Sequence, residues 1–460
     1  MPEVKLHKLK NNSVVRIAGS FILLLLMTGA MCLTSCSYPA ERTAGSQDGI
    51  IRTADGLSRD GYELEKVVIL SRHNIRSPLV DKDSLLGSIT PHEWFDWTSG
   101  PAELSLRGGM QETALGQFFR NWVEDEGLLN ANYIPEGDEI RFYANSKQRT
   151  IATAEYFSAG FLPVAGIPIE YHMEFDKMDP VFTPQLTFAT EKYKEDAVNQ
   201  IEELYMDDIS SLKGNFDLLS EVLDIEDSAA RKSGSVGELV PEDVEFILEK
   251  DAEPGLKGSL KTATSASDAL VLQYYEEKNP LKAAFGHRLD IKQWEDISRI
   301  KDVYGDVLFT APLIAANVAH PLLQEINNEL CDGDRKFTFL CGHDSNVGSV
   351  LAALDTEEYF LPDTIEKKTP IGCKLVFGKW RDKDGKEFIS MDLVYLTTRQ
   401  LRNINVLGSD NPPDVFPLEL KGIPAGDDGL YPSEDFMERL KDAIDLYDCL
   451  YEEYCGENAA

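Results

Sequence analysis

The sequence predicts an α/β fold in which a mostly parallel β-sheet is flanked by helices and interrupted by an inserted, mainly α-helical cap domain. Residues 66–70 form a nearly continuous apolar, β-branched run, as in a central strand that is buried on both faces of a parallel sheet. Candidate strands alternate with candidate helices along most of the chain, which is the pattern of α/β proteins. Between residues 181 and 300 this alternation stops, and helical patterns separated by polar linkers take its place.

The elements before the insertion are predicted from periodicity and turn residues. The strand at 66–70 leads into a loop at 72–78 that a proline closes. Apolar residues recur at helical spacing in the second half of 104–122, and a second helical pattern covers 148–161. Short β-rich runs at 139–144 and 167–171 are predicted to be strands.

The insertion and the second half of the core follow the same logic. Helices are expected at 191–212, 240–251 and 267–276. After the insertion the sequence predicts a strand at 337–340, a helix at 346–354 and strands at 374–379, 388–396 and 418–422. A final helix starts at Ser433, the expected N-cap, with Glu434 and Asp435 in its first turn, where acidic side chains favour the helix dipole.

The first 36 residues have the pattern of an export signal: basic residues precede an apolar run at 17–32 that is short for a membrane-spanning helix. Residues 33–36, Leu-Thr-Ser-Cys, resemble a bacterial lipoprotein cleavage box, which implies that Cys36 is acylated and becomes the first mature residue. The alternative is an uncleaved N-terminal anchor. Both place the protein outside the cytoplasm, lipid-anchored or otherwise tethered to a bacterial membrane, facing the periplasm or lying at the cell surface. The expected organisation is a signal peptide at 1–35, a tether at 36–60, core at 61–180, insertion at 181–300 and core at 301–460.

Composition limits the possible partners. The 460 residues carry 45 Lys and Arg against 79 Asp and Glu, a formal net charge of −34, which is the opposite of a nucleic-acid binder. Five cysteines follow Cys36, and an odd number leaves at least one thiol unpaired within the chain. Cys449 and Cys455 can pair only if the last helix ends between them, and the pairing of Cys331, Cys341 and Cys373 stays open.

Two motifs directly follow predicted strands, where open α/β sheets form ligand crevices. One runs from Arg72 to Pro78 with the sequence Arg-His-Asn-Ile-Arg-Ser-Pro, and the other is His343-Asp344. Arginine forks match phosphate oxygens, a neutral imidazole can attack phosphorus, and a carboxylic acid can protonate a leaving alkoxide. The combination suits hydrolysis of a phosphate monoester, and it does so without a metal ion.

Taken together and in this order, the motifs resemble the histidine acid phosphatases, in particular the branch with bacterial glucose-1-phosphatases and periplasmic phytases. The resemblance covers residues 65–450 and includes the segments 144–150, 178–180, 272–276, 343–346, 369–372 and 400–403. Asn74, where most of that family has glycine, is similar to the glucose-1-phosphatase form. The resemblance implies a phosphoglycerate-mutase-like/acid-phosphatase core, the phosphate monoester as small-molecule partner, and no cofactor.

The resemblance also implies roles for individual residues. His73 would be the nucleophile and Asp344 the proton donor, while Arg72, Arg76, Arg149 and His343 would bind phosphate. The departure at Asn74 leaves the nucleophile and both motif arginines intact, so it bears on specificity and not on chemistry. We assign no metal site and no nucleotide-binding loop, because His92-Glu93 lacks a second histidine four residues after the first and the chain has no Gly-rich loop followed by Lys-Ser/Thr.

Several alternatives stay open. The histidines of both motifs could be structural, Arg149 could be an ordinary residue at a helix start, and Asp344 could cap the helix that follows it. Glucose 1-phosphate is the first expected substrate and phytate the second. A protein of another class, a phosphate- or sugar-binding lipoprotein without catalysis, would not need a nucleophile and an acid. The oligomeric state cannot be read from the sequence.

Overall fold

The computed structural model describes residues 54–460 apart from 79–83, 405–406, 409 and 457–460. The predicted signal peptide, most of the predicted tether and Cys36 lie outside the described residues. In the described part of the chain no single helix is both long and apolar enough to cross a membrane, although two consecutive helices that meet at an angle of 84° pass that test as a pair.

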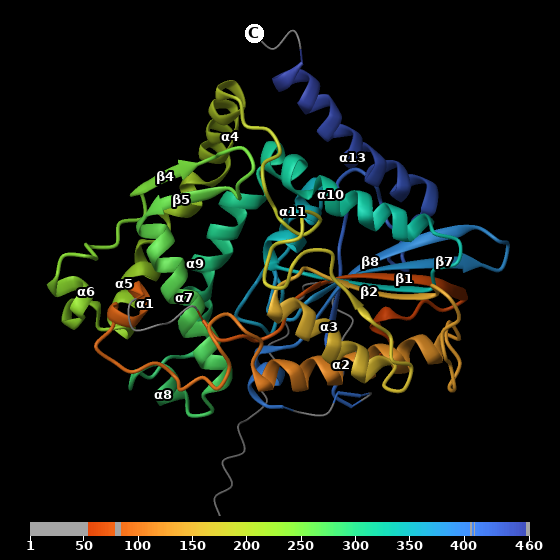
Figure 1. Ribbon diagram of the computed structural model, residues 1–460, viewed down its shortest axis with the longest axis horizontal. Coiled ribbons are helices and arrows are strands. Elements are labelled where there is room, and N and C mark those ends of the chain that lie inside the picture. Colours follow the sequence, from red (N-terminus) through yellow and green to blue (C-terminus); the bar gives the residue numbers. More distant parts are fainter. Residues whose placement is uncertain (1–53, 79–83, 405–406, 409, 457–460) are drawn as a thin grey trace, which may run out of the picture. The chain divides into compact units, whose positions relative to one another are not determined.

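A mixed β-sheet forms the centre of the fold (Figure 1). Its strand order is β10-β8-β7-β1-β6-β2-β3, and β9 pairs with β8. The strands are β1 (Tyr62–Arg72), β2 (Ile140–Ala144), β3 (Ile169–Glu170), β6 (Phe337–Gly342), β7 (Lys374–Asp382), β8 (Glu387–Tyr395), β9 (Asp414–Pro417) and β10 (Leu430–Pro432).

The expectation of a mostly parallel sheet is not confirmed. β1, β6, β2 and β3 are parallel to one another, whereas β1 with β7, β7 with β8, and β8 with both β9 and β10 are antiparallel. The tight turn between β7 and β8 explains one of these pairs, because a connection of a few residues can join only antiparallel neighbours.

The sheet is covered on both faces, as the apolar run at 66–70 predicts. Val67 and Ile69 belong to one hydrophobic cluster and Val68 and Leu70 to the other, and all four are fully buried. The helices α2 (Leu106–Asp125) and α3 (Gln148–Phe161) contribute to the first cluster. The helices α10 (Pro312–Cys331), α11 (Asp344–Ala353) and α13 (Ser433–Cys455) cover the other face (Figure 1).

The segment between β3 and α10 is mainly helical, and its helices lie beside one edge of the layered core (Figure 1), but the predicted cap domain is not confirmed. It contains α4 (Glu191–Ser210), α5 (Lys213–Val222), α6 (Ala229–Lys232), α7 (Ser259–Glu276), α8 (Pro280–Ala283) and α9 (Ile291–Phe309). The predicted helix at 240–251 is wrong: β4 (Val244–Ile247) and β5 (Gly255–Gly258) form an antiparallel hairpin there. The boundary predicted at residue 300 falls within α9, and the division into core and insertion stays a prediction.

Three smaller expectations differ at the carboxyl-terminal end. The predicted strand at 418–422 lies slightly earlier, as β9, and Leu420 takes part only in isolated bridges. Pro432 precedes α13 as its N-cap, so Ser433 is the first helical residue. Because α13 continues to Cys455, Cys449 and Cys455 share one helix and do not pair, and the five cysteines of the described chain are free thiols.

Candidate active site

The predicted site residues follow three neighbouring parallel strands. β1, β6 and β2 lie side by side, so their carboxyl ends reach the same edge of the sheet. The backbone N–H of His73, just after β1, donates to the carbonyl oxygen of Gly342 at the end of β6, at 3.0 Å. The N–H of Asn145, just after β2, donates to the carbonyl oxygen of Cys341 at 2.9 Å. These bonds extend the sheet into the loops and hold the loops together.

His73 and His343 meet across this edge. Their ring centroids are 5.5 Å apart with an interplanar angle of 71°, and both side chains are buried. Nδ1 of His73 lies 2.9 Å from the carbonyl oxygen of Asn74. Because a carbonyl oxygen only accepts hydrogen bonds, the proton of the neutral ring lies on Nδ1 and the lone pair on Nε2. The local fold therefore prepares Nε2 of His73 as a nucleophile.

His343 is oriented by an amide. Oδ1 of Asn145 accepts from the N–H of Asp179 at 2.9 Å, so the amide nitrogen Nδ2 faces His343 and lies 2.7 Å from its Nε2. The proton of neutral His343 then lies on Nδ1, the atom 3.4 Å from Nη2 of Arg149. Two donors face the same space, and a bound anion would complete this arrangement.

Three arginines surround the histidines. Arg72 ends β1, Arg76 lies in the following loop and Arg149 in the first turn of α3. Nη1 of Arg72 donates to Oε1 of Glu366 at 2.7 Å, and Nη2 of Arg76 donates to Oδ2 of Asp268 at 2.9 Å. In all three guanidinium groups, however, the Nε–H is buried and finds no hydrogen-bond partner among the described residues. Buried unpaired donors are costly, and the charges of all three arginines act on His73, so the cluster can accommodate an anionic ligand.

Asp344 lies beside this cluster at the start of α11. The N-cap of α11 is His343, so the alternative role of Asp344 as the helix cap does not hold, although its Oδ1 accepts from the N–H of Ser345 at 3.0 Å. Oδ2 is 2.8 Å from Nζ of Lys301 and 3.5 Å from Nη2 of Arg72. The Asp344 side chain is 35% exposed, so its carboxyl group can contact a ligand although both of its oxygens already contact neighbouring groups.

The sequence analysis missed the residues that complete this network. Lys301 comes from α9, Asp268 from α7 and Glu366 from the loop before β7. Nζ of Lys301 is 3.4 Å from Oε1 of Glu366 and 3.9 Å from Oδ1 of Asp268. Only Glu366 had a signal in the sequence, because it lies three residues before the segment at 369–372. No group of three or more His, Cys, Asp and Glu side chains in the described part of the chain is arranged to hold a metal ion.

The charges in the site decide which groups are ionised. Burial lowers the pKa of His73 well below its ordinary value, and the nearby charge of Arg149 lowers it further. Burial also lowers the pKa of Arg149 to about 10, with Arg76 contributing. Burial favours the neutral form of Asp344, but Lys301 and Arg72 outweigh it and hold the pKa of Asp344 well below its usual range. In the ligand-free protein a neutral imidazole therefore stands beside a carboxylate.

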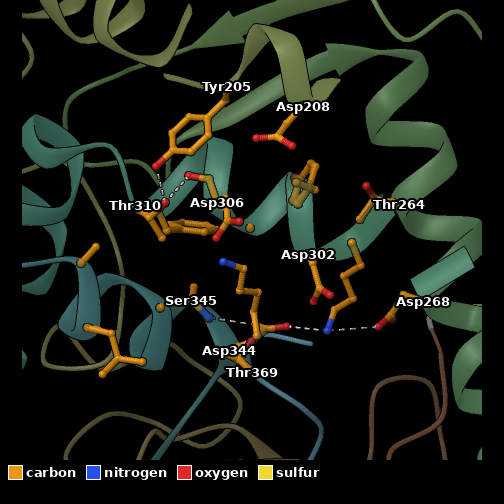
Figure 2. A pocket seen from close by; sticks show the side chains of 18 of the residues that line it. Tyr205, Asp208, Thr264, Asp268, Asp302, Asp306, Thr310, Asp344, Ser345 and Thr369 are labelled. Atoms are coloured by element: carbon orange, nitrogen blue, oxygen red, sulfur yellow. Dashed lines mark hydrogen bonds and ion pairs between the residues drawn. The ribbon is translucent and has the colours of Figure 1, made fainter. Parts of the chain in front are cut away.

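A cavity of about 740 Å³ opens from the cluster toward the helical segment (Figure 2). Asp268 and Asp344 lie at one end, and Tyr205 and Asp208 lie at the other beside Asp306 (Figure 2). Its walls carry more acidic than basic side chains: Asp208, Asp268, Asp302, Asp306, Asp344, Asp355, Glu357 and Glu358 against Arg76, Lys261, Lys301, Lys368 and Lys421. Burial raises the pKa of Asp302 to about 7 and that of Asp306 to about 6, so both are largely uncharged in acid.

The structure thus brings together all the predicted site residues that it describes, namely His73, Asp344, Arg72, Arg76, Arg149 and His343. Cys36, the predicted lipidation site, lies outside the described residues.

Comparisons with known proteins agree with this geometry. The pattern of the histidine phosphatase superfamily (branch 2) matches residues 63–394. A glucose-1-phosphatase of Providencia rettgeri is 39% identical over 422 residues, covering 90% of this chain and 98% of the relative. A glucose-1-phosphatase of Salmonella typhimurium is 36% identical and covers 82% of this chain and 92% of its own length. The solved phytase of Citrobacter braakii superposes with a TM-score of 0.75 at 27% identity, covering 83% of this chain and 98% of the phytase.

The matched pattern spans the strands and loops that carry His73 and His343, and two relatives above 30% identity cover most of the chain. The chain therefore belongs to branch 2 of the histidine phosphatase superfamily and is a phosphoric monoester hydrolase.

Proposed function

We propose that this protein hydrolyses glucose 1-phosphate and related sugar phosphates through a phosphohistidine intermediate on His73. The observation that carries the proposal is that three arginines, each with a buried Nε–H that is unpaired among the described residues, lie close enough to His73 for their charges to lower its pKa, while Nδ1 of its ring is held by the carbonyl oxygen of Asn74. Arg72, Arg76 and Arg149, with Nδ1–H of His343, would bind the phosphoryl oxygens.

The reaction follows from these positions. Nε2 of His73 forms a bond to phosphorus as the bond from phosphorus to the sugar oxygen breaks, and the departing oxygen takes a proton from Asp344. Water then attacks the phosphohistidine, the phosphorus–nitrogen bond breaks, and the proton released from water returns to Asp344. Inorganic phosphate leaves and His73 is again neutral.

Asp344 must carry a proton when the sugar oxygen leaves, although it is a carboxylate in the ligand-free protein. A bound phosphate sets negative charge against Arg72, which weakens the hold of that arginine on the carboxylate and raises the pKa of Asp344. In mild acid the monoanionic substrate also carries a proton into the site. The depressed pKa of His73 keeps the nucleophile neutral under the same conditions, which supports acid phosphatase activity.

The relatives and the cavity favour a sugar phosphate over phytate. Both relatives above 30% identity are named glucose-1-phosphatases. The phytase of Citrobacter braakii supports phytate as the alternative substrate. Phytate, however, would place several further phosphates against a cavity wall rich in carboxylates, in a chain with a formal net charge of −34.

A substrate panel tests the proposal. Purified protein and the His73→Ala variant are assayed in mild acid with glucose 1-phosphate, glucose 6-phosphate, phytate and p-nitrophenyl phosphate. We expect the highest kcat/KM among the natural esters on glucose 1-phosphate, and no turnover by His73→Ala. Preference for phytate would establish the alternative enzyme, and failure to hydrolyse any of the esters would leave a non-catalytic binding protein.

We further propose that the chain is exported and anchored by a lipid on Cys36, facing the periplasm or at the cell surface of a bacterium. The support is the sequence alone, an apolar run at 17–32 that ends in Leu-Thr-Ser-Cys. Metabolic labelling with a palmitate analogue should mark the wild type and not Cys36→Ser. Label that persists on the serine variant would refute the lipid anchor.

A further inference from the structure

A buried ion pair lies beneath the loop that carries the nucleophile. Glu112 of α2 and Lys374, the first residue of β7, have fully buried side chains, and Nζ of Lys374 is 2.8 Å from Oε1 of Glu112. Nζ also donates to the carbonyl oxygen of Gly372 at 2.7 Å. Removing two charges from water is costly, and apolar residues in the place of such a pair are often no less stable. The pair therefore calls for a role besides stability.

Asn74 connects the pair to the loop. Its side chain is buried, Nδ2 donates to Oε1 of Glu112 at 2.7 Å, and Oδ1 accepts from the N–H of Ile75, also at 2.7 Å. Both ends of the amide are thus engaged. The neighbouring Gly372 has a φ of +73°, and a Cβ on it would lie only 2.6 Å from Nδ2 of Asn74. The absence of a side chain at position 372 gives the amide its space.

The hydrogen bond to Ile75 has a consequence for His73. The N–H of Ile75 and the C=O of Asn74 belong to one peptide group, which is planar and trans, so the two bonds point in opposite directions. A side chain that holds the N–H on one side fixes the direction of the C=O on the other. That carbonyl oxygen accepts from Nδ1 of His73 at 2.9 Å. The contacts run without a break from Lys374 through Glu112 and Asn74 to the imidazole ring.

We propose that Lys374 balances the buried charge of Glu112, and that Glu112 and Asn74 are positioning residues that act through the peptide group between residues 74 and 75. They hold His73 in the tautomer with an unprotonated Nε2, and they fix the direction of its ring. The inference rests on the proposed function, because it requires that Nε2 of His73 attacks phosphorus. Asn74, expected from the sequence to bear on specificity, then bears on the chemistry.

Two matched double variants separate positioning from stability. Oε2 of Glu112 finds no hydrogen-bond partner among the described residues, so a glutamine can place its carbonyl oxygen at Oε1 and its amide nitrogen at Oε2. Glu112→Gln/Lys374→Met removes both buried charges and keeps an acceptor for Asn74. Glu112→Leu/Lys374→Met removes the charges and the acceptor. The two variants share the loss of both charges and differ in whether position 112 offers Asn74 an acceptor oxygen.

The readouts are kcat and KM on p-nitrophenyl phosphate, the rapid-quench rate of phosphoenzyme formation, and the melting temperature. Because misplacement of a reacting group by about 1 Å can cost ~100-fold in rate, we expect kcat of the leucine variant to fall ~10- to 100-fold, and that of the glutamine variant by less than about threefold. KM should change little, since the phosphate-binding arginines are untouched. Asn74→Ala, which leaves the ion pair in place, should show the same loss of kcat as the leucine variant.

The outcomes distinguish the inference from the proposed function. Equal kcat in the two double variants would show that the cluster only stabilises the fold. Asn74→Ala with wild-type kcat would do the same, and it decides the matter if the leucine variant does not fold. A wild-type protein without phosphohistidine, in contrast, would refute the proposed function itself. Phosphate trapped on wild-type Nε2, and formed slowly in both Asn74→Ala and the leucine variant, supports both.

Discussion

Replacing Asp344 by asparagine separates the proton donor from the nucleophile. The substitution keeps the shape of the side chain and an oxygen that can accept from the N–H of Ser345, now 3.0 Å from Oδ1. It removes the charge that faces Lys301 at 2.8 Å and Arg72 at 3.5 Å. Neither cation is left alone, because both also pair with Glu366. We therefore expect the variant to fold and its phosphate pocket to stay intact.

The expected loss depends on the leaving group. A sugar alkoxide needs a proton as it departs, and general acid catalysis is typically worth ~10²–10⁴-fold, or ~2.7–5.4 kcal/mol of barrier. A p-nitrophenolate ion is stable without that proton. Asp344→Asn should therefore lose ~10²–10⁴-fold in kcat/KM, which reports formation of the phosphoenzyme, on glucose 1-phosphate and far less on p-nitrophenyl phosphate.

The assay compares kcat/KM on the two substrates at one mildly acidic pH, with His73→Ala as the reference for loss of the nucleophile. His73→Ala should abolish both activities alike. Acid-labile, base-stable phosphate should be trapped on Asp344→Asn with the aryl substrate. Equal losses on the two esters would remove Asp344 from the proton-donor role and leave it as a partner of Lys301 at the start of α11.

Four further predictions follow from the same geometry. Arg76→Ala should raise KM and lower kcat together. Arg76→Lys should restore little activity, because an ammonium group cannot reproduce the two parallel hydrogen bonds of a guanidinium group to phosphate. A lysine variant with activity near wild type would show that Arg76 has only a structural role. The low pKa of His73 keeps it neutral and reactive below pH 6.5. In a plot of kcat/KM on an aryl phosphate against pH, the fall in activity on the acid side should therefore lie below pH 6.5. A fall that begins above pH 6.5 would contradict the argument that burial lowers the pKa of His73. The carboxyl of Asp306 lines the cavity, so Asp306→Ala should raise KM for glucose 1-phosphate ~10-fold, the value of about one hydrogen bond, and not KM for p-nitrophenyl phosphate. Asp296→Ala, on the same helix and paired with Lys292, is the matched control, and equal effects of the two variants would exclude a sugar contact. Activity should survive dialysis against EDTA and be inhibited by vanadate, whereas activity that a divalent ion restores after EDTA would contradict a mechanism carried by arginine and histidine.

The site residues that the sequence predicts best are those that directly follow a predicted strand. The loops after β1 and β6 each follow a run of buried apolar residues, so the positions of His73 and His343 could be inferred from strand ends. The place of Lys301 in the site could not be inferred, because a lysine between hydrophobic positions of a helix gives the same sequence pattern whether it faces solvent or a carboxylate. The pairing of β7 with β1 was missed for a related reason: local patterns show that a strand exists but not the direction of its neighbour.

The contacts of the Asn74 side chain could not be predicted from the sequence either. A sequence shows that asparagine replaces glycine, but not that Glu112 and Lys374 approach the same point from α2 and β7. The hairpin of β4 and β5 cannot be told from a helix by periodicity, because each strand has only four residues and one charged side chain. In both cases tertiary contacts supply information that local spacing does not hold.

The central position of β1 also governs when catalysis can begin during synthesis. β1 is paired with β6 and β7, and Arg72 is bonded to Glu366, 294 positions later in the chain. At ~5–20 residues per second, a ribosome needs roughly 15–60 s to make the intervening segment. For most of that time the strand that leads to His73 has neither sheet neighbour, because β6 comes late in the interval, together with His343 and Asp344, and β7 comes after it. The growing chain therefore has no assembled phosphatase site, and the first turnover shows that β6 and β7 have paired with β1.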